Sequence, residues 1–209
     1  MSCALCERRK PRRDCPALSR SICGACCGRY RELTLDCPAT CPHLVAAYRY
    51  EWQRPLPAAQ QFRPDFHLTR RQMEENQALL LALLEAVQAL HRRQRDLSDA
   101  DVAAALESRL QALETEQSGL IYDASPAGGL RRELYRQLAA IEQTPIQAAA
   151  LAPAAAASRE QRIVAYVWLI RILRTYSSMR ARARGFLVWM NDRFPAHPAA
   201  LSSPLVLGA

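Results

Sequence analysis

The sequence predicts a mainly helical protein with a small cysteine-rich module at its amino-terminal end. All eight cysteines of the 209-residue chain fall within the first 41 residues. After residue 66, apolar residues recur at three- and four-residue intervals, which is the spacing of amphipathic helices. We therefore expect four parts: the cysteine-rich module at 1–50, a proline-containing linker at 51–66, a helical bundle at 67–195 and a disordered tail at 196–209.

The cysteine spacing predicts two interleaved metal sites. Two CxxC pairs can converge their four sulfurs on one ion and complete a tetrahedron. The first set is Cys3, Cys6, Cys23 and Cys26. The remaining set of four is Cys15, Cys27, Cys37 and Cys41. Because Cys15 lies between the two pairs and Cys27 directly follows Cys26, we expect a cross-brace layout, distantly similar to that of B-box and RING modules.

The chemistry predicted for these sites is structural, with two zinc ions per chain. Residues 1–14 contain no apolar run long enough for a secretory signal peptide, so we expect a cytoplasmic protein with reduced thiols rather than disulfides. Four thiolates leave no open position for water on either ion, so we expect no enzymatic activity. An iron–sulfur or thiol-redox protein is the other chemical alternative, although the ferredoxin run of cysteines that ends in Cys-Pro is absent.

His43 is a ninth candidate ligand. It could replace Cys37 or Cys41, hydrogen-bond to a ligand sulfur, or simply open the helix that begins near Leu44. The pairing of cysteines between the two sites and the role of His43 stay open at this level.

Basic residues are concentrated in the first third of the chain. Residues 1–71 carry 13 Arg or Lys against 6 acids, and the rest carries 15 against 14. Eight thiolates and two zinc ions would lower the net charge from +8 to about +4. The residues of a basic loop before Cys15 are Arg8, Arg9, Lys10, Arg12 and Arg13. This loop could bind phosphates, but no aromatic residues are interleaved for base stacking and no zinc-finger recognition helix is present.

Helical segments follow the cysteines. A short helix at 44–52 is expected to pack on the zinc module through Leu44, Val45, Tyr48 and Trp52, before a linker rich in proline. The longer helices are expected to begin at Thr69, at Ser98 with Asp101, at Ser125-Pro126 and at Ser158 with Gln161. Their expected ends are near Arg95, near Gly119 and at Thr144-Pro145, and an alanine-rich spacer is expected at 148–157.

The last long helix has an apolar centre at 163–173 and belongs in the middle of the bundle. Eleven residues flanked by arginines are too few to cross a bilayer. The run Arg180, Arg182 and Arg184 is expected to form a solvated helix face, before a final amphipathic turn that Pro195 closes. The three leucines at 79–81 exceed the needs of one buried face, so a homo-oligomer is an open alternative.

Three stretches of the chain resemble a group of uncharacterised bacterial proteins. Residues 22–44, ICGACCGRYRELTLDCPATCPHL, share a double-cysteine CCG, a following Arg-Glu and a CPxxCPxL ending with that group. SGLIYDASP at 118–126 and RARGFLVWMNDRFP at 182–195 fit it as well, so the likeness covers most of the chain. The resemblance implies no activity. It supports zinc binding by Cys23, Cys26, Cys27, Cys37 and Cys41, and it puts His43 where an aromatic residue is expected, which argues against a ligand role.

The function predicted from these features is that of a non-catalytic zinc protein. Its module and bundle would together form a surface for an unidentified protein partner, in regulation or assembly. The alternative is a nucleic-acid-binding regulator that uses the loop from Arg8 to Arg13. Binding that weakens steeply as salt rises would favour this alternative, because phosphate contacts release counterions.

Overall fold

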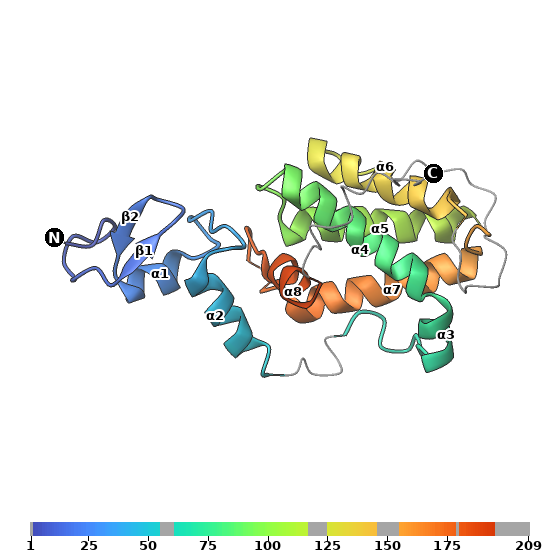
Figure 1. Cartoon of the computed structure of the whole chain (residues 1–209), viewed down its shortest axis with the longest axis horizontal. Coiled ribbons are helices and arrows are strands. Elements are labelled where there is room, and N and C mark those ends of the chain that lie inside the picture. Colours follow the sequence, from blue (N-terminus) through green and yellow to red (C-terminus); the bar gives the residue numbers. More distant parts are fainter. Residues whose placement is uncertain (1, 55–60, 117–124, 146–154, 179, 195–209) are drawn as a thin grey trace, which may run out of the picture.

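The computed structural model describes residues 2–54, 61–116, 125–145, 155–178 and 180–194. The protein is mainly helical, and a small module with two short strands lies at one end of a helical bundle (Figure 1). The elements of the module are β1 (Arg13–Cys15), β2 (Arg20–Ile22), α1 (Gly24–Tyr30) and α2 (Pro42–Glu51). Those of the bundle are α3 (Arg70–Glu75), α4 (Gln77–Arg93), α5 (Asp99–Glu116), α6 (Gly129–Gln143), α7 (Arg159–Tyr176) and α8 (Gly185–Arg193).

The module is built around a minimal hairpin. Strands β1 and β2 are antiparallel, with Arg13 opposite Ile22 and Cys15 opposite Arg20. Helix α1 begins two residues after β2 and is only seven residues long. Such short elements are marginal in isolation, because a two-stranded hairpin needs a further apolar layer for independent stability. The hairpin and α1 therefore need stabilising contacts beyond their own backbone hydrogen bonds.

The bundle is centred on α7, as the apolar run at 163–173 predicts. Helix α7 packs against α4, α5 and α8, and α6 packs against α4 and α5. Among the fully buried side chains are Leu83, Leu90, Leu97, Leu106, Leu113, Leu134, Tyr166 and Phe186. None of the described helices is both long enough and apolar enough to cross a membrane.

Three predicted helix starts are confirmed by their capping bonds. Thr69 and Ser158 each form a reciprocal capping box with the glutamine three residues later. Ser98 pairs in the same way with Asp101, whose backbone N–H donates to the Ser98 hydroxyl at 3.3 Å. These signals hold because each bond is made within four residues of sequence. The predicted end at Thr144 is also confirmed, since Thr144 is the C-cap of α6.

Two predicted helix bounds are wrong. The helix expected from Thr69 to Arg95 is broken at Asn76, whose side-chain Nδ2 donates to the carbonyl of Gln72 at 2.7 Å, so that α3 and α4 are separate helices. This local bond competes with continued helix formation. Helix α6 begins at Gly129 rather than at Ser125, after Gly128 adopts a positive φ of 106° that favours glycine.

Some sequence predictions lie outside the described residues. These are Gly119 as a helix end, most of the stretch 118–126, the prolines at 55 and 57, most of the alanine-rich spacer, Pro195 and the tail at 196–209. Of the leucines at 79–81, Leu79 and Leu80 are buried within the chain and Leu81 is 39% exposed. Self-association stays a prediction.

Helix α2 joins the module to the bundle. Its Trp52 indole donates to the carbonyl of Tyr176 at 3.3 Å, and a series of aromatic contacts runs from Tyr48 through Trp52 and Tyr176 to Trp189. The expectation that Trp52 packs on the module is therefore wrong, because its indole contacts Tyr176 of the bundle. At Gly185 the backbone of α8 comes so close that an added Cβ would lie 2.1 Å from the Tyr176 carbonyl, so only glycine fits.

Candidate metal centre

The four cysteines of the two CxxC pairs come together in the module. The sulfur atoms of Cys3, Cys6, Cys23 and Cys26 all lie within 4.8 Å of one another. Four sulfurs that each lie about 2.3 Å from one zinc ion are about 3.8 Å apart in a tetrahedron. The separation between the Cys6 and Cys23 sulfurs is 4.0 Å. The arrangement can therefore hold a metal ion with a small contraction.

Backbone bonds position these four sulfurs. Cys23 caps α1, and its sulfur accepts from the backbone N–H of Cys26 at 3.4 Å, which places both residues at the positive end of the helix. The Cys3 sulfur accepts from the N–H of Cys23 at 3.2 Å. The loop after Cys6 folds back, because the N–H of Cys3 donates to the carbonyl of Arg9 at 2.9 Å. Both CxxC turns are thus tied to each other.

The thiols of this set differ in acidity. Burial opposes ionisation of Cys3, but the backbone N–H groups of Cys23, Cys6 and Leu5 outweigh it and lower the pKa of Cys3 to about 6. Burial and the neighbouring sulfurs, with Cys23 first among them, raise the pKa of Cys26 to about 12. Four thiolates this close repel one another, and a divalent cation between them removes that cost. The donor set therefore suits a thiophilic metal such as zinc.

The second set of cysteines lines one small cavity. Cys15 ends β1, Cys27 lies in α1, Cys37 lies in the loop after α1, and Cys41 caps α2. All four border a cavity of about 10 Å³, close to the space that one water molecule needs. Burial, and then the charges of Cys41 and Cys15, raise the pKa of Cys37 to about 11, against the opposing effect of a backbone bond. Among the described residues, only the first set meets the 4.8 Å separation.

Two other side chains border this second cavity. The Arg13 guanidinium donates to the Cys27 sulfur at 3.3 Å, so it points into the module. His43, in the first turn of α2, also lines the cavity and is half-buried. The structure thus brings His43 near the second set without placing it among the four sulfurs of the first.

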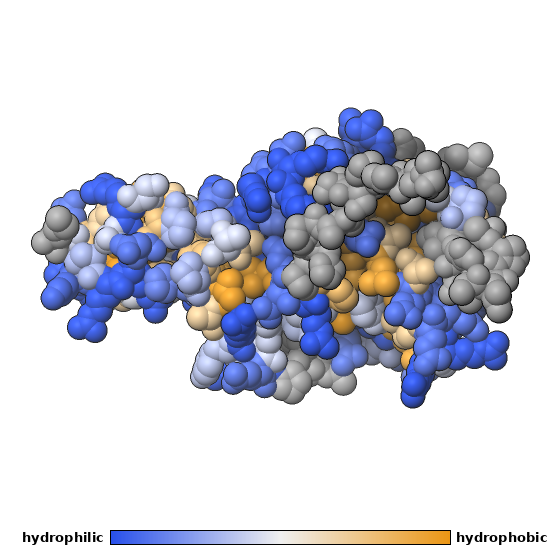
Figure 2. Space-filling model, viewed as in Figure 1, coloured by the Kyte–Doolittle hydropathy of each residue, from blue (hydrophilic) through white to orange (hydrophobic). Residues whose placement is uncertain are grey.

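The basic loop divides into inward and outward residues. Arg13 is turned toward Cys27, whereas Arg8, Arg9, Lys10 and Arg12 are exposed. Arg8 and Arg9 border a surface hollow together with Arg29 of α1, a residue that sequence analysis did not single out. Figure 2 shows hydrophilic residues over most of this face of the module's free end, and hydrophobic residues near its junction with the bundle.

Glu32 forms a buried polar junction between module and bundle. It is 1% exposed and has a positive φ of 57°. Its carboxylate accepts from the Tyr48 hydroxyl at 2.6 and 2.7 Å, from the Ser178 hydroxyl at 3.2 Å and from the backbone N–H of Arg184 at 2.8 Å. Burial and the Glu32 charge raise the pKa of Tyr48, which keeps its hydroxyl a donor.

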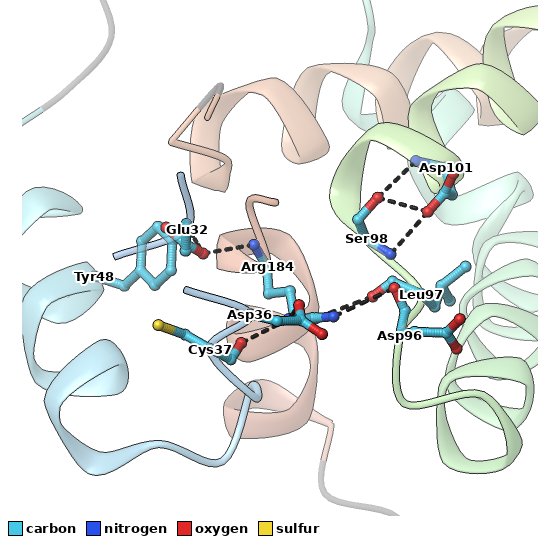
Figure 3. Close-up of polar contacts among 9 residues, drawn as sticks. All are labelled: Glu32, Asp36, Cys37, Tyr48, Asp96, Leu97, Ser98, Asp101 and Arg184. Atoms are coloured by element: carbon cyan, nitrogen blue, oxygen red, sulfur yellow. Dashed lines mark hydrogen bonds and ion pairs between the residues drawn. The ribbon is translucent and has the colours of Figure 1, made fainter. Parts of the chain in front are cut away.

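Arg184 forms the other half of this junction (Figure 3). Arg184 is 2% exposed, and its Nη1 donates to the Asp36 carboxylate and to the Cys37 carbonyl, both at 2.7 Å. It also donates to the carbonyls of Leu97 and Asp96 at 3.2 and 3.3 Å. One guanidinium therefore ties the segment that carries Cys37 to the segment between α4 and α5.

The expectation of a solvated arginine face is wrong for Arg184. Residues 180–184 form a loop between α7 and α8, so helical spacing does not apply to them, and Arg184 turns into the protein. Arg180 donates to the carbonyl of Arg31 at 2.9 Å. Sequence analysis missed the pairing because it joins residues about 150 apart.

The chain matches no protein-family model, and comparisons with curated proteins and with solved structures found no similar protein. The assignment of the site therefore rests on its own chemistry and geometry.

Proposed function

We propose that the chain is a cytoplasmic, non-catalytic protein that binds two zinc ions and acts as an interaction or regulatory module. The observation that carries the proposal is the close approach of the four sulfurs of Cys3, Cys6, Cys23 and Cys26. Thiolate-only coordination that is complete without water is typical of structural zinc and gives no nucleophile for catalysis.

The second zinc ion is assigned to Cys15, Cys27, Cys37 and Cys41. The shared cavity supports this assignment, and so does the influence of Cys41 and Cys15 on the pKa of Cys37. Binding there would draw the sulfurs closer together and replace the Arg13 guanidinium as the partner of the Cys27 sulfur. His43 then lies outside the four ligands, in contact with the site.

A protein partner is the interaction that we infer first. Three large apolar side chains in the first 51 residues are exposed, namely Leu5 at 38%, Leu33 at 49% and Tyr50 at 61%. Large apolar and aromatic side chains that remain exposed on a small metal-stabilised domain are available to a partner. The buried junction at Glu32 and Arg184 holds the module and the bundle as one surface, which suits regulation or assembly.

Elemental analysis of the purified chain tests the metal assignment. We expect two zinc atoms per chain and no iron. The Cys3→Ser/Cys6→Ser and Cys37→Ser/Cys41→Ser double variants should each hold at most one zinc, because each loses two ligands of one site. Because the chain has no cysteines beyond residue 41, every change in metal content reports on the module.

The matched control is His43→Ala, which changes a residue beside the second cavity without removing a thiolate. It should keep two zinc atoms, and a loss of one would make His43 a ligand. A wild-type chain with a single zinc would remove the second site. Iron with a brown colour would instead identify an iron–sulfur protein, and reversible thiol oxidation without any metal would identify a redox protein.

A further inference from the structure

The surface hollow beside the first cysteine set has the composition of an anion site. It has a volume of about 250 Å³ and is bordered by Cys6, Cys26, Arg8, Arg9, Arg29 and Tyr30. Pockets for drug-sized molecules measure about 300–1,000 Å³, so this hollow fits a smaller group such as a phosphate with part of its sugar. Two of the bordering residues are cysteines of the metal set, so the hollow lies directly on the candidate metal centre.

The arginines of the hollow have no carboxylate partner. The ten ion pairs among the described residues all involve residues from Asp36 onward. Residues 2–30 carry seven cations against two acids, Glu7 and Asp14, and Asp14 accepts from the Ser21 hydroxyl at 2.7 Å. Several cations of the bundle are therefore paired with acids, whereas the cations of residues 2–30 form no ion pair with a described residue.

The metal itself does not cancel this charge. One zinc ion with four thiolates has a net charge of −2, which the three guanidiniums of the hollow outweigh. Arg8, Arg9 and Arg29 are exposed, whereas three of the four sulfurs are buried, so an approaching anion meets the guanidiniums first. The Arg29 guanidinium lies over the Tyr30 ring, 5.4 Å from its centre, which restrains one of the three.

We propose that this hollow binds a phosphate of a nucleic-acid backbone. Arginine favours phosphate because its planar guanidinium donates two parallel hydrogen bonds to two oxygens. A repeating polyanion is favoured over a free phosphate because Lys10 and Arg12, which follow Arg9 closely in the sequence, are also exposed and can contact further phosphates. The contacts read phosphates and not bases, so the binding is independent of nucleotide sequence.

The phosphate site rests on the proposed metal centre. Arg8 and Arg9 lie two and three residues after Cys6, and the carbonyl of Arg9 accepts from the N–H of Cys3, so a metal bound by Cys3 and Cys6 would order the backbone that carries both arginines. Arg29 is held in the same way, because α1 begins at the capping residue Cys23. Removal of the metal should therefore disperse the three guanidiniums and weaken phosphate binding.

Fluorescence anisotropy of a fluorescein-labelled thymidine 20-mer with the zinc-loaded full chain tests the proposal. We expect binding that weakens as salt rises from roughly 50 to 200 mM. The salt slope is the decrease of log affinity with log salt concentration, and for a single strand each phosphate contact contributes about 0.7 to it. Arg8→Ala/Arg9→Ala/Arg29→Ala should therefore lower the slope by about 2 and weaken binding at least tenfold.

The matched control removes the same charge from positions outside the hollow. Arg49, Arg70 and Arg71 are exposed and each pairs with an acid, so Arg49→Ala/Arg70→Ala/Arg71→Ala should change affinity by less than about threefold. An equal loss in both triple variants would overturn the site. If the alanine triple variant loses zinc, Arg8→Lys/Arg9→Lys/Arg29→Lys takes its place in the test. Weaker binding of this variant with an unchanged salt slope supports the phosphate site. An unchanged affinity contradicts the phosphate site.

Two further outcomes distinguish failure of the phosphate site from failure of the proposed metal centre. Zinc-loaded chain that does not bind the oligonucleotide at low salt would overturn the phosphate site and leave the metal centre standing. A chain without metal would remove the centre on which the site rests. Poly-glutamate that competes as well as unlabelled thymidine 20-mer would overturn the choice of phosphate, because the hollow would then bind acidic protein.

Discussion

The module and the bundle bury different kinds of side chain. In residues 2–41, seven of the ten buried apolar residues are cysteines, and the others are Ile22, Leu35 and Ala39. The bundle has no cysteine and buries leucines, aromatic residues and the apolar face of α7. The bundle can therefore fold by burial of apolar area, whereas the module has too little such area and needs cross-links between its sulfurs.

The two regions depend on each other unequally. The bundle supplies Arg184 and Ser178, which bind the loop that carries Glu32 and Cys37. Among the residues that the structure describes, the hydrogen bonds of the first cysteine set all lie within the module. We infer that the first metal site is independent of the bundle and that the second is supported by it.

Arg184→Met is expected to have the largest effect of a single change outside the cysteines. It leaves the carbonyls of Cys37 and Leu97 and the Asp36 carboxylate without their donor. The half-exposed Asp36 can be hydrated, but each buried carbonyl that is left without a donor costs about 1–3 kcal/mol. Urea denaturation should show that loss, and elemental analysis should show weaker zinc retention at the second site with the first retained.

The control for Arg184→Met is Arg174→Met, which removes a guanidinium paired with Glu107 at 2.8 Å and about 40% exposed on both sides. Such a pair contributes about 0–1 kcal/mol. Equal destabilisation by the two variants would contradict a special role for Arg184.

A core substitution in the bundle should separate the two regions most cleanly. Leu106 is fully buried in α5, so Leu106→Ala should cost about 2–5 kcal/mol of unfolding free energy. The zinc content of this variant should stay at the wild-type value, because the substitution leaves a cavity in the bundle and all the cysteines lie in the module. Leu81→Ala, at a 39% exposed position, is the control and should cost about 0.5 kcal/mol or less. Zinc loss in Leu106→Ala would mean that the regions fold as one unit.

The last expected effect is a pH dependence of the bundle. Asp99 is buried beneath the start of α8, where its carboxylate accepts from the N–H groups of Phe186 and Leu187. Burial raises the pKa of Asp99 to about 7. An unfolded aspartate has a pKa of about 3.9, so the folded state binds the extra proton and this contribution to stability is lost as pH rises from about 4 to 7.

The Asp99→Asn variant isolates this contribution. Urea denaturation should show that the stability of the wild type falls steadily, relative to that of the variant, as pH rises over that range. His91 gives the opposite trend, because burial lowers its pKa to about 4, but it is present in both proteins and cancels in the difference. A difference that does not change with pH would show that Asp99 ionises normally in the folded protein.

Some of these features were accessible from the sequence because their causes are local. The caps at Thr69, Ser98 and Ser158 depend on residues three positions apart, and the first cysteine set depends on two CxxC turns. The apolar run in α7 is buried because nearly every side of it is apolar. A structure can be predicted from the sequence when all the residues that determine it lie within a few positions of one another.

Other features depend on contacts that no local pattern contains. The break at Asn76 arises from one side-chain bond, and Arg29 joins Arg8 and Arg9 only after the hairpin places α1 beside the first CxxC turn. Arg184 belongs to a basic run that is typical of a solvated helix, and its burial depends on Glu32 and Asp36 from the other region. The second cysteine set could be predicted only in part. The spacing of Cys37 and Cys41 is a local pattern, but we infer that the approach of all four sulfurs depends on the contacts between the module and the bundle.

Hydrogen–deuterium exchange before and after chelation tests most directly whether metal takes the place of an apolar core in the module. We expect the chelated chain to exchange quickly across residues 2–41, because structural zinc supplies on the order of 10 kcal/mol to such modules. Protection in α4, α5 and α7 should remain, and zinc should restore the module. Unchanged protection of residues 2–41 in verified metal-free protein would contradict the account.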